Sequence, residues 1–273
     1  MTAERPGARG IAVGALLLIL LSAGCGPGAV PQTSEELNVS VSILPQRYFV
    51  ERVGGDRVTV NVMVLPGESP ATYEPKPAQL KALSGADAYV SIGVPFESAW
   101  LDRIAAANDT MVMVDTTAGI ERLGGPDNPD PHIWLSPTLV KTQARTIADA
   151  LAALDPDHER EYEANLDEFI ADIETLDADI RQTLDGVEQR AFMVFHPSWG
   201  YFARDYGLEM IPVEVGGQEP SAAELAALVR RAREENIQVI FAQPEFSTRN
   251  AETIAAEIGG EVLLVSPLAE EWL

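Results

Sequence analysis

The chain has few of the residues that mark disulfide-rich or nucleic-acid-binding proteins. Its 273 residues include one cysteine, Cys25. A single cysteine excludes a disulfide framework and any zinc site built from several thiolates. Lys and Arg number 19 against 42 Asp and Glu, which gives a formal net charge of -23. A basic surface for nucleic acid is therefore not expected, whereas cations are attracted.

Sequence motifs of common enzymes are also missing. The chain has no His-Glu-x-x-His, no Gly-x-Ser-x-Gly and no phosphate-binding glycine loop. It has 3 histidines, so each one can be considered separately. We therefore expect a protein that is not an enzyme. A zinc hydrolase that activates water through two histidines is kept as an alternative.

The N-terminal segment has the pattern of a targeting signal. Arginines precede an apolar run over residues 11–21, which is too short to span a bilayer and is typical of a signal-peptide core. Small residues then precede Cys25, a pattern that resembles a bacterial lipobox and implies a lipid on this cysteine. We expect a signal peptide over residues 1–25 and a flexible tether over residues 26–37. The lipid would be the only attachment to the membrane.

Short β-rich runs alternate with helical patterns in the rest of the chain. The runs that predict strands are residues 38–44, 58–65, 87–92, 110–114, 191–195, 209–213, 237–241 and 261–265. Helical patterns between them cover residues 46–53, 77–84, 97–107, 199–206, 222–233 and 248–258. This alternation favours βαβ units with parallel sheets.

One long helix is predicted between the two sets of strands. Apolar residues recur at spacings of three and four from about residue 158 to residue 184, which indicates one helical stripe roughly 40 Å long. We therefore predict an α/β protein with two lobes, each with a four-stranded, mostly parallel sheet flanked by helices. The expected segments are an N-terminal lobe over residues 38–155, a linking helix over 156–186 and a C-terminal lobe over 187–273.

Two of the three histidines follow predicted strands. In parallel sheets, ligands bind beyond the carboxyl ends of the strands. His132 lies in the loop after the fourth predicted strand, and His196 directly follows the fifth. Imidazole suits Zn²⁺ and its neighbours in the transition series. One such histidine is more often structural, but two in opposite halves suggest a metal site. His158 opens the long helix and is expected to be solvated.

Four separated motifs make the chain recognisable. They are Tyr-Glu-Pro-Lys-Pro at residues 73–77, Asp-Pro-His-Ile-Trp-Leu-Ser-Pro at 130–137, Phe-His-Pro-Ser-Trp-Gly-Tyr-Phe at 195–202 and Ser-Pro-Leu at 266–268. From about residue 38 to residue 273, the chain resembles the zinc- and manganese-binding receptors of ABC importers, the ZnuA-like or TroA-like family. The resemblance implies a metal held between two α/β lobes and delivered to an ABC permease with its ATPase.

The family's ligand set carries over only in part. His132 and His196 match two of its metal-binding positions. A histidine is usual in the loop before Glu-Pro, where this chain has Ala71, and an aspartate is usual before Pro-Leu, where it has Ser266. The family usually continues with a further helix, whereas this chain stops at Leu273. The resemblance therefore leaves open that the second lobe is incomplete here.

Other side chains must complete the coordination, because Zn²⁺ takes about four ligands. Glu68 is the first candidate, in the same loop as the replaced histidine. Ser266 could ligate weakly or hold a water, and Glu214 and Glu219 are further options. Gln243 is expected to orient a histidine from behind. Water is the simplest completion.

Zn²⁺ is the expected metal, with Mn²⁺ or Fe²⁺ as alternatives if the remaining donors are oxygens. The expected protein is a monomeric, extracytoplasmic receptor, lipid-anchored at the cell membrane or periplasmic. The changes from the family pattern suggest another alternative. In that case the chain is a degenerate receptor of the same fold that binds another ligand or acts in adhesion.

Overall fold

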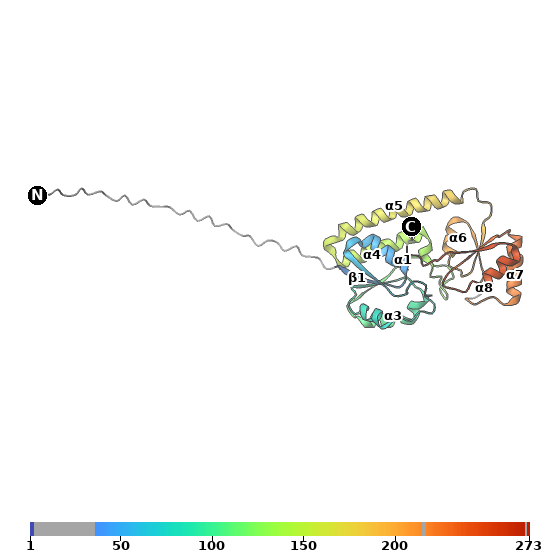
Figure 1. Ribbon diagram of the computed structural model, residues 1–273, viewed down its shortest axis with the longest axis horizontal. Coiled ribbons are helices and arrows are strands. Elements are labelled where there is room, and N and C mark those ends of the chain that lie inside the picture. Colours follow the sequence, from blue (N-terminus) through green and yellow to red (C-terminus); the bar gives the residue numbers. More distant parts are fainter. Residues whose placement is uncertain (3–35, 215–216, 271) are drawn as a thin grey trace. The chain divides into compact units, whose positions relative to one another are not determined.

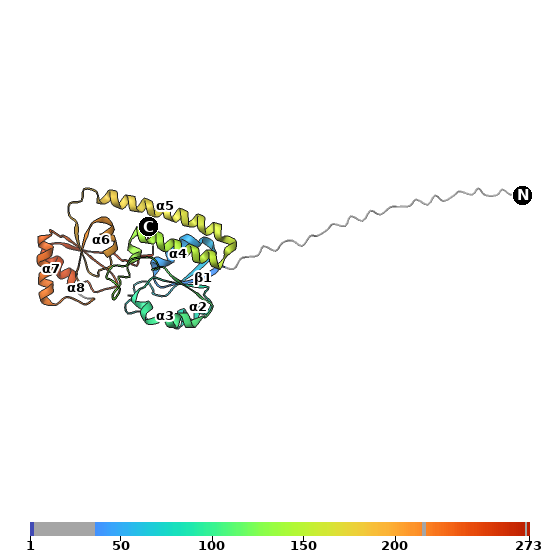
Figure 2. The same cartoon turned by 180° about the vertical axis from the view of Figure 1, so that it is seen from behind.

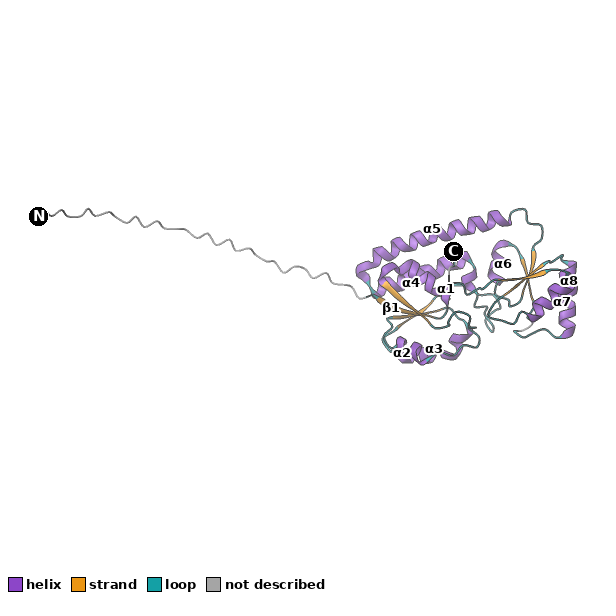
Figure 3. Ribbon diagram, in the orientation of Figure 1, coloured by secondary structure: helices purple, strands orange, loops and turns teal. Residues whose placement is uncertain are grey.

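The computed structural model describes residues 1–2, 36–214, 217–270 and 272–273. Those from residue 36 onward belong to one compact unit, which contains two parallel sheets with helices around them (Figures 1 and 3). The predicted two-lobed α/β class is confirmed. The predicted signal peptide, Cys25 and nearly all of the tether lie outside the described residues. The expected lobe boundaries stay predictions.

The first sheet has the strand order β2-β1-β3-β4, with all neighbouring strands parallel. Its strands are β1 (Leu37–Val41), β2 (Val58–Val62), β3 (Ala88–Ser91) and β4 (Val112–Asp115). Its helices are α1 (Leu44–Gly54), α2 (Pro77–Leu83), α3 (Pro95–Ala107) and α4 (Pro137–Leu154), with a short 3-10 turn at Gly55–Arg57. Helices α2 and α3 lie on one side of the sheet, and α1 and α4 on the other (Figure 3). Both faces are therefore covered, as the apolar strands require.

Helix α4 was not among the helices predicted from the sequence. Its start is fixed by Ser136, whose side chain accepts a hydrogen bond from the Leu139 amide at 3.1 Å. Proline follows at the first helical position, where its missing N–H is harmless. Val140, Ile147 and Leu151 then form a buried stripe at helical spacing. Both the cap and the stripe are visible in the sequence.

The predicted linking helix is confirmed as α5 (Glu159–Leu184), preceded by a 3-10 turn at Pro156–His158. It runs past the helices of the first lobe towards the second sheet (Figures 1 and 2). Phe169 and Ile173 are fully buried on its inner side. Further along, Asp177 accepts a hydrogen bond from the Tyr206 hydroxyl of the second lobe at 2.7 Å. The helix therefore contacts both lobes.

The second sheet repeats the pattern of the first, with the order β6-β5-β7-β8 and parallel neighbours. Its strands are β5 (Ala191–Val194), β6 (Glu209–Pro212), β7 (Val239–Ala242) and β8 (Glu261–Leu264). Its helices are α6 (Gly200–Tyr206), α7 (Ala222–Glu234) and α8 (Arg249–Ile258). In each sheet the strand that comes first in the chain, β1 or β5, is an interior strand with a parallel neighbour on both sides. The loops that follow these strands and their neighbours therefore lie at the same edge of the sheet.

The last residues of the chain return to the first lobe. The Trp272 ring packs edge-on against Phe49 with ring centroids 5.3 Å apart, and its Nε1 donates to the Trp134 carbonyl at 2.7 Å. Trp134 in turn donates from Nε1 to the Pro267 carbonyl at 2.7 Å. The C-terminal segment thus connects the two lobes. No helix within the described residues is long and apolar enough to cross a bilayer.

Candidate metal centre

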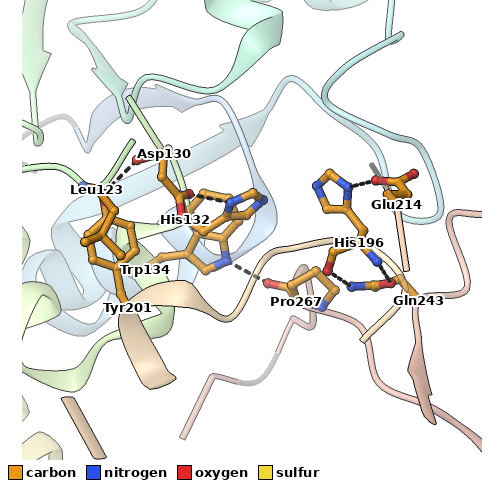
Figure 4. Close-up of polar contacts among 9 residues, drawn as sticks. All are labelled: Leu123, Asp130, His132, Trp134, His196, Tyr201, Glu214, Gln243 and Pro267. Carbon is orange, nitrogen blue, oxygen red and sulfur yellow. Dashed lines mark hydrogen bonds and ion pairs between the residues drawn. The ribbon is translucent and has the colours of Figure 1, made fainter. Parts of the chain in front are cut away.

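His132 lies in a loop that both lobes hold in place. The loop follows β4 and leads into a 3-10 turn at Ile133–Leu135. Asp130 Oδ1 accepts hydrogen bonds from the His132 amide at 2.9 Å and from its Nδ1 at 2.6 Å. The buried hydroxyl of Tyr201, in the second lobe, donates to the Asp130 carbonyl at 2.8 Å and accepts from the Leu123 amide at 3.0 Å (Figure 4). Both the loop and the ring therefore have fixed orientations.

His196 is held at the carboxyl end of β5 by residues that follow the two neighbouring strands. Gln243 follows β7 and is 1% exposed. Its side chain accepts from the His196 amide at 3.1 Å and donates to the His196 carbonyl at 3.0 Å. Glu214 follows β6, and its Oε2 accepts from His196 Nδ1 at 2.6 Å (Figure 4). Gln243 therefore fixes the backbone of His196, whereas Glu214 orients the ring.

The two imidazole rings meet across the lobes. Their centroids lie 5.3 Å apart, with the ring planes at 69°. In each ring a carboxylate accepts the Nδ1 proton. This bond favours the neutral tautomer whose Nε2 carries the free lone pair, as carboxylate partners do for zinc-bound histidines. The pair can therefore offer two nitrogen donors to one cation.

Burial favours the neutral form of the His132 ring. Its side chain is 13% exposed, and this burial is the main cause that lowers the pKa of His132 from its ordinary value of 6.5. The hydrogen bond that the ring donates to Asp130 opposes the shift, while the nearby His196 adds to it. The net lowering favours metal binding, since only the neutral imidazole can coordinate.

A cavity of about 520 Å³ opens beside the two histidines. Its walls come from the loops that follow the strands of both sheets, and they include Ser69, Pro70, Ala71, Ser198, Glu245 and Phe246. The Phe246 ring stacks on His196 with centroids 4.8 Å apart. The cavity therefore lies at the sheet edges where the sequence predicted a ligand.

The remaining candidate ligands take different positions. Glu68 and Glu219 are exposed and are not among the described residues that line the cavity. Glu214 is bonded to His196 as described above. The Ser266 hydroxyl donates to Glu245 Oε1 at 2.6 Å and accepts from the Leu268 amide at 3.1 Å. A ligand role for Glu68 or Ser266 stays a prediction without a supporting contact.

The described part of the chain contains no cluster of three or more His, Cys, Asp or Glu side chains that could hold a metal ion. The pair of histidines is therefore the strongest metal-binding feature. The third histidine, His158, is remote from it. Its Nδ1 bonds to Asp155 at 2.7 Å beside the start of α5, and its side chain is 22% exposed rather than fully solvated.

Sequence reasoning did not assign the carboxylates that orient the rings. Asp130 precedes His132 by two residues in an Asp-Pro-His turn, and this short spacing could have identified it. Glu214 was considered only as a metal ligand. Its contact with His196 depends on the parallel pairing of β5 with β6, which brings two distant segments together.

Two α/β lobes with paired histidines at their facing strand ends define a two-lobed solute-binding protein. Residues 39–272 match the family model described as ZnuA, zinc-uptake complex component A periplasmic. The chain therefore belongs to this family.

Individual relatives agree with the family assignment. The chain is 29% identical to the high-affinity zinc uptake system protein ZnuA of Bacillus subtilis, over 91% of this chain and 85% of that protein. It is 28% identical to the zinc-binding lipoprotein AdcA of Streptococcus pneumoniae over 87% of this chain, but spans about half (51%) of that protein. A crystal structure of ZnuA has a TM-score of 0.85 and 54% identity, and the match covers 87% of this chain and 94% of that one.

Proposed function

We propose that this chain captures a transition-metal ion outside the cytoplasm and delivers it to an ABC permease. The observation that carries the proposal is the meeting of His132 and His196 in one cavity, 5.3 Å apart between ring centroids, each with Nδ1 bonded to a carboxylate. This arrangement leaves both Nε2 atoms for a metal. The relatives named for zinc uptake support the same function.

Zn²⁺ is the proposed metal because the donors that the site offers are imidazole nitrogens. Mn²⁺ prefers carboxylate, carbonyl and water oxygens, whereas imidazole suits zinc. The net charge of -23 raises the local concentration of any cation. We further propose a monomer anchored through a lipid on Cys25, with a permease and an ATPase as partners. The proposed role is binding and delivery without catalysis.

The metal content of the protein in its natural setting tests this proposal. The full chain would be produced in a bacterial envelope with its leader, purified without chelators and analysed by elemental mass spectrometry. We expect close to one zinc per molecule. His132→Ala and His196→Ala should each lose most of it, because each removes one of two protein nitrogens.

His158→Ala is the matched control, since it removes the third histidine, which bonds to Asp155 away from the cavity. It should retain the zinc content of the unchanged protein. If His132→Ala and His196→Ala retained as much zinc as His158→Ala and the unchanged protein, the proposed site would be refuted. Hydrolytic turnover that depends on His132 would instead support the hydrolase alternative, and absence of metal in the unchanged protein would support a degenerate receptor.

A further inference from the structure

The protein supplies fewer donors than a zinc ion requires. Zn²⁺ takes about four ligands, and His132 and His196 provide two. Asp130 and Glu214 are already bonded to the Nδ1 atoms of these rings. Among the residues that the structure places, no third His, Cys, Asp or Glu joins the pair. In this arrangement of the described side chains, the missing donors come from outside the chain.

The size of the cavity exceeds what water ligands would need. Two waters occupy about 60 Å³, at roughly 30 Å³ each, whereas the cavity measures about 520 Å³. Pockets for small organic ligands are typically about 300–1,000 Å³. Much of the wall is apolar, with Pro70, Ala71, Phe246 and Leu268 among its residues. Space and surface are thus suited to an organic molecule beside the metal.

Two residues of the wall carry buried oxygens that lack partners. Ser198 is 0% exposed, and its Oγ has no hydrogen-bond partner among the described residues. Glu245 Oε1 accepts from Ser266, but its Oε2 is buried with no such partner. Buried polar atoms are nearly always paired in folded proteins. Both residues line the cavity, so a ligand with its own hydrogen-bonding groups could pair these two oxygens.

Contacts between the lobes hold the cavity walls in place. Tyr201 of the second lobe bonds to the Asp130 carbonyl at 2.8 Å, and Trp134 bonds to the Pro267 carbonyl at 2.7 Å. Ser136, at the start of α4, donates a hydrogen bond to Asp205 of α6. Movement of one lobe that brought in a third protein ligand would have to break these bonds. With these bonds in place, His132 and His196 remain the two protein donors in the cavity.

We propose that the cavity takes its metal as a complex with a small chelator of the amino-acid type, with one amine and one carboxylate. This inference rests on the metal-binding function proposed above. The chelator's nitrogen and one carboxylate oxygen complete the four ligands begun by His132 and His196. The chelator's other carboxylate oxygen accepts a hydrogen bond from the Ser198 hydroxyl, and the chelator's N–H donates a hydrogen bond to Glu245 Oε2. The rest of the molecule contacts the apolar wall near Phe246.

Equilibrium dialysis with L-histidine as the probe chelator tests the proposal. The metal-stripped full-length mature protein is dialysed against zinc at free concentrations fixed by a metal buffer, with and without tritiated L-histidine. We expect one histidine retained per bound zinc, and no retention without zinc. Histidine should lower the free zinc concentration at which half of the protein is loaded at least tenfold.

Variants of Ala71 separate chelator binding from zinc binding. Ala71→His adds an imidazole to the cavity wall. It should bind zinc alone at least tenfold more tightly and retain less histidine per zinc. Ala71→Leu is the matched control, because it fills space without adding a donor and should lose histidine without gaining affinity for zinc alone. Ser198→Ala should reduce the histidine retained per zinc more than fivefold.

The outcomes distinguish the two proposals. One zinc bound with the same half-saturation whether or not histidine is present, and with no histidine retained, would overturn the chelator proposal and leave the metal receptor intact. Zinc bound in neither condition would overturn the receptor function as well.

Discussion

His132 and His196 each donate a hydrogen bond from Nδ1 to a carboxylate, which favours a free lone pair on Nε2 for the proposed metal. The carboxylates are Asp130 and Glu214, at 2.6 Å from the respective Nδ1 atoms. Such partners fix the tautomer and orientation of metal-binding histidines, and their removal typically lowers metal affinity by about 10- to 100-fold. The site therefore depends on four side chains, although only two would touch the metal.

The protonation of His132 gives a testable consequence at this scale. Because burial lowers its pKa below the ordinary 6.5, less than half of this ring should be protonated at pH 6.5 in the metal-free protein. Protonation of His132 should therefore lower the zinc affinity by less than about twofold between pH 7.5 and pH 6.5. An NMR titration of the metal-free protein would follow the ring directly.

The midpoint of that titration should lie below 6.5. His196→Ala should move it upward, because the neighbouring ring contributes to the lowering. A midpoint above 6.5 in the unchanged protein would show that the hydrogen bond to Asp130 outweighs burial, contrary to this account.

Single residues show how far sequence reasoning reaches at the site. The positions of His132 and His196 followed from the rule that ligands bind at the carboxyl ends of parallel strands. Gln243 was predicted to orient a histidine. Its side chain does contact His196, but it bonds to the backbone amide and carbonyl of His196 and not to the ring. Glu68 was the first choice for a third ligand. It is exposed and is not among the described residues that line the cavity, so its ligand role stays a prediction. Loop conformation, which decides such cases, has no simple period in the sequence.

Helix α5 packs against the first lobe through an aromatic cluster around Phe169. Its Phe169 is fully buried and lies 5.9 Å from both Tyr48 and Phe49 of α1, measured between ring centroids. The Arg52 guanidinium also lies 4.9 Å from the centre of the Phe169 ring. This aromatic cluster attaches the connecting helix to the first lobe.

Phe169→Ala should therefore destabilise the protein by about 3–5 kcal/mol, the usual cost of removing a buried phenylalanine. Urea unfolding followed by circular dichroism would measure it. Glu168→Ala, one residue away and exposed, is the matched control and should change the unfolding free energy by less than about 0.5 kcal/mol. Similar values for both variants would mean that α5 does not rely on this cluster.

Elements with a clear period were predicted well from the sequence. The strand runs and the stripe of α5 agree with the structure to within a few residues, because burial on one or both faces imposes a pattern. Helix α4 was overlooked despite its Ser136 cap and buried stripe. Its sequence follows directly on the Asp-Pro-His motif, which was interpreted only as a loop with a ligand.

At the scale of the whole molecule, the cleft is built by contacts that cross between the lobes. Tyr201 reaches the loop of His132, and the C-terminal segment brings Pro267 and Trp272 to Trp134. These pairs are separated by 71, 133 and 138 residues, respectively. Neither periodicity nor spacing in a single sequence reports such contacts. The family resemblance predicted a cleft between the lobes, and the structure shows the hydrogen bonds that cross it.

The position of zinc in the loaded protein tests whether His132 and His196 hold the metal. Crystals of the zinc-loaded full chain would be measured at the zinc absorption edge, so that anomalous scattering locates the ion. We expect one strong peak at about 2.0–2.1 Å from Nε2 of both His132 and His196, the usual zinc–nitrogen distance. A peak bound to surface carboxylates such as Glu68, with neither histidine in contact, would contradict it.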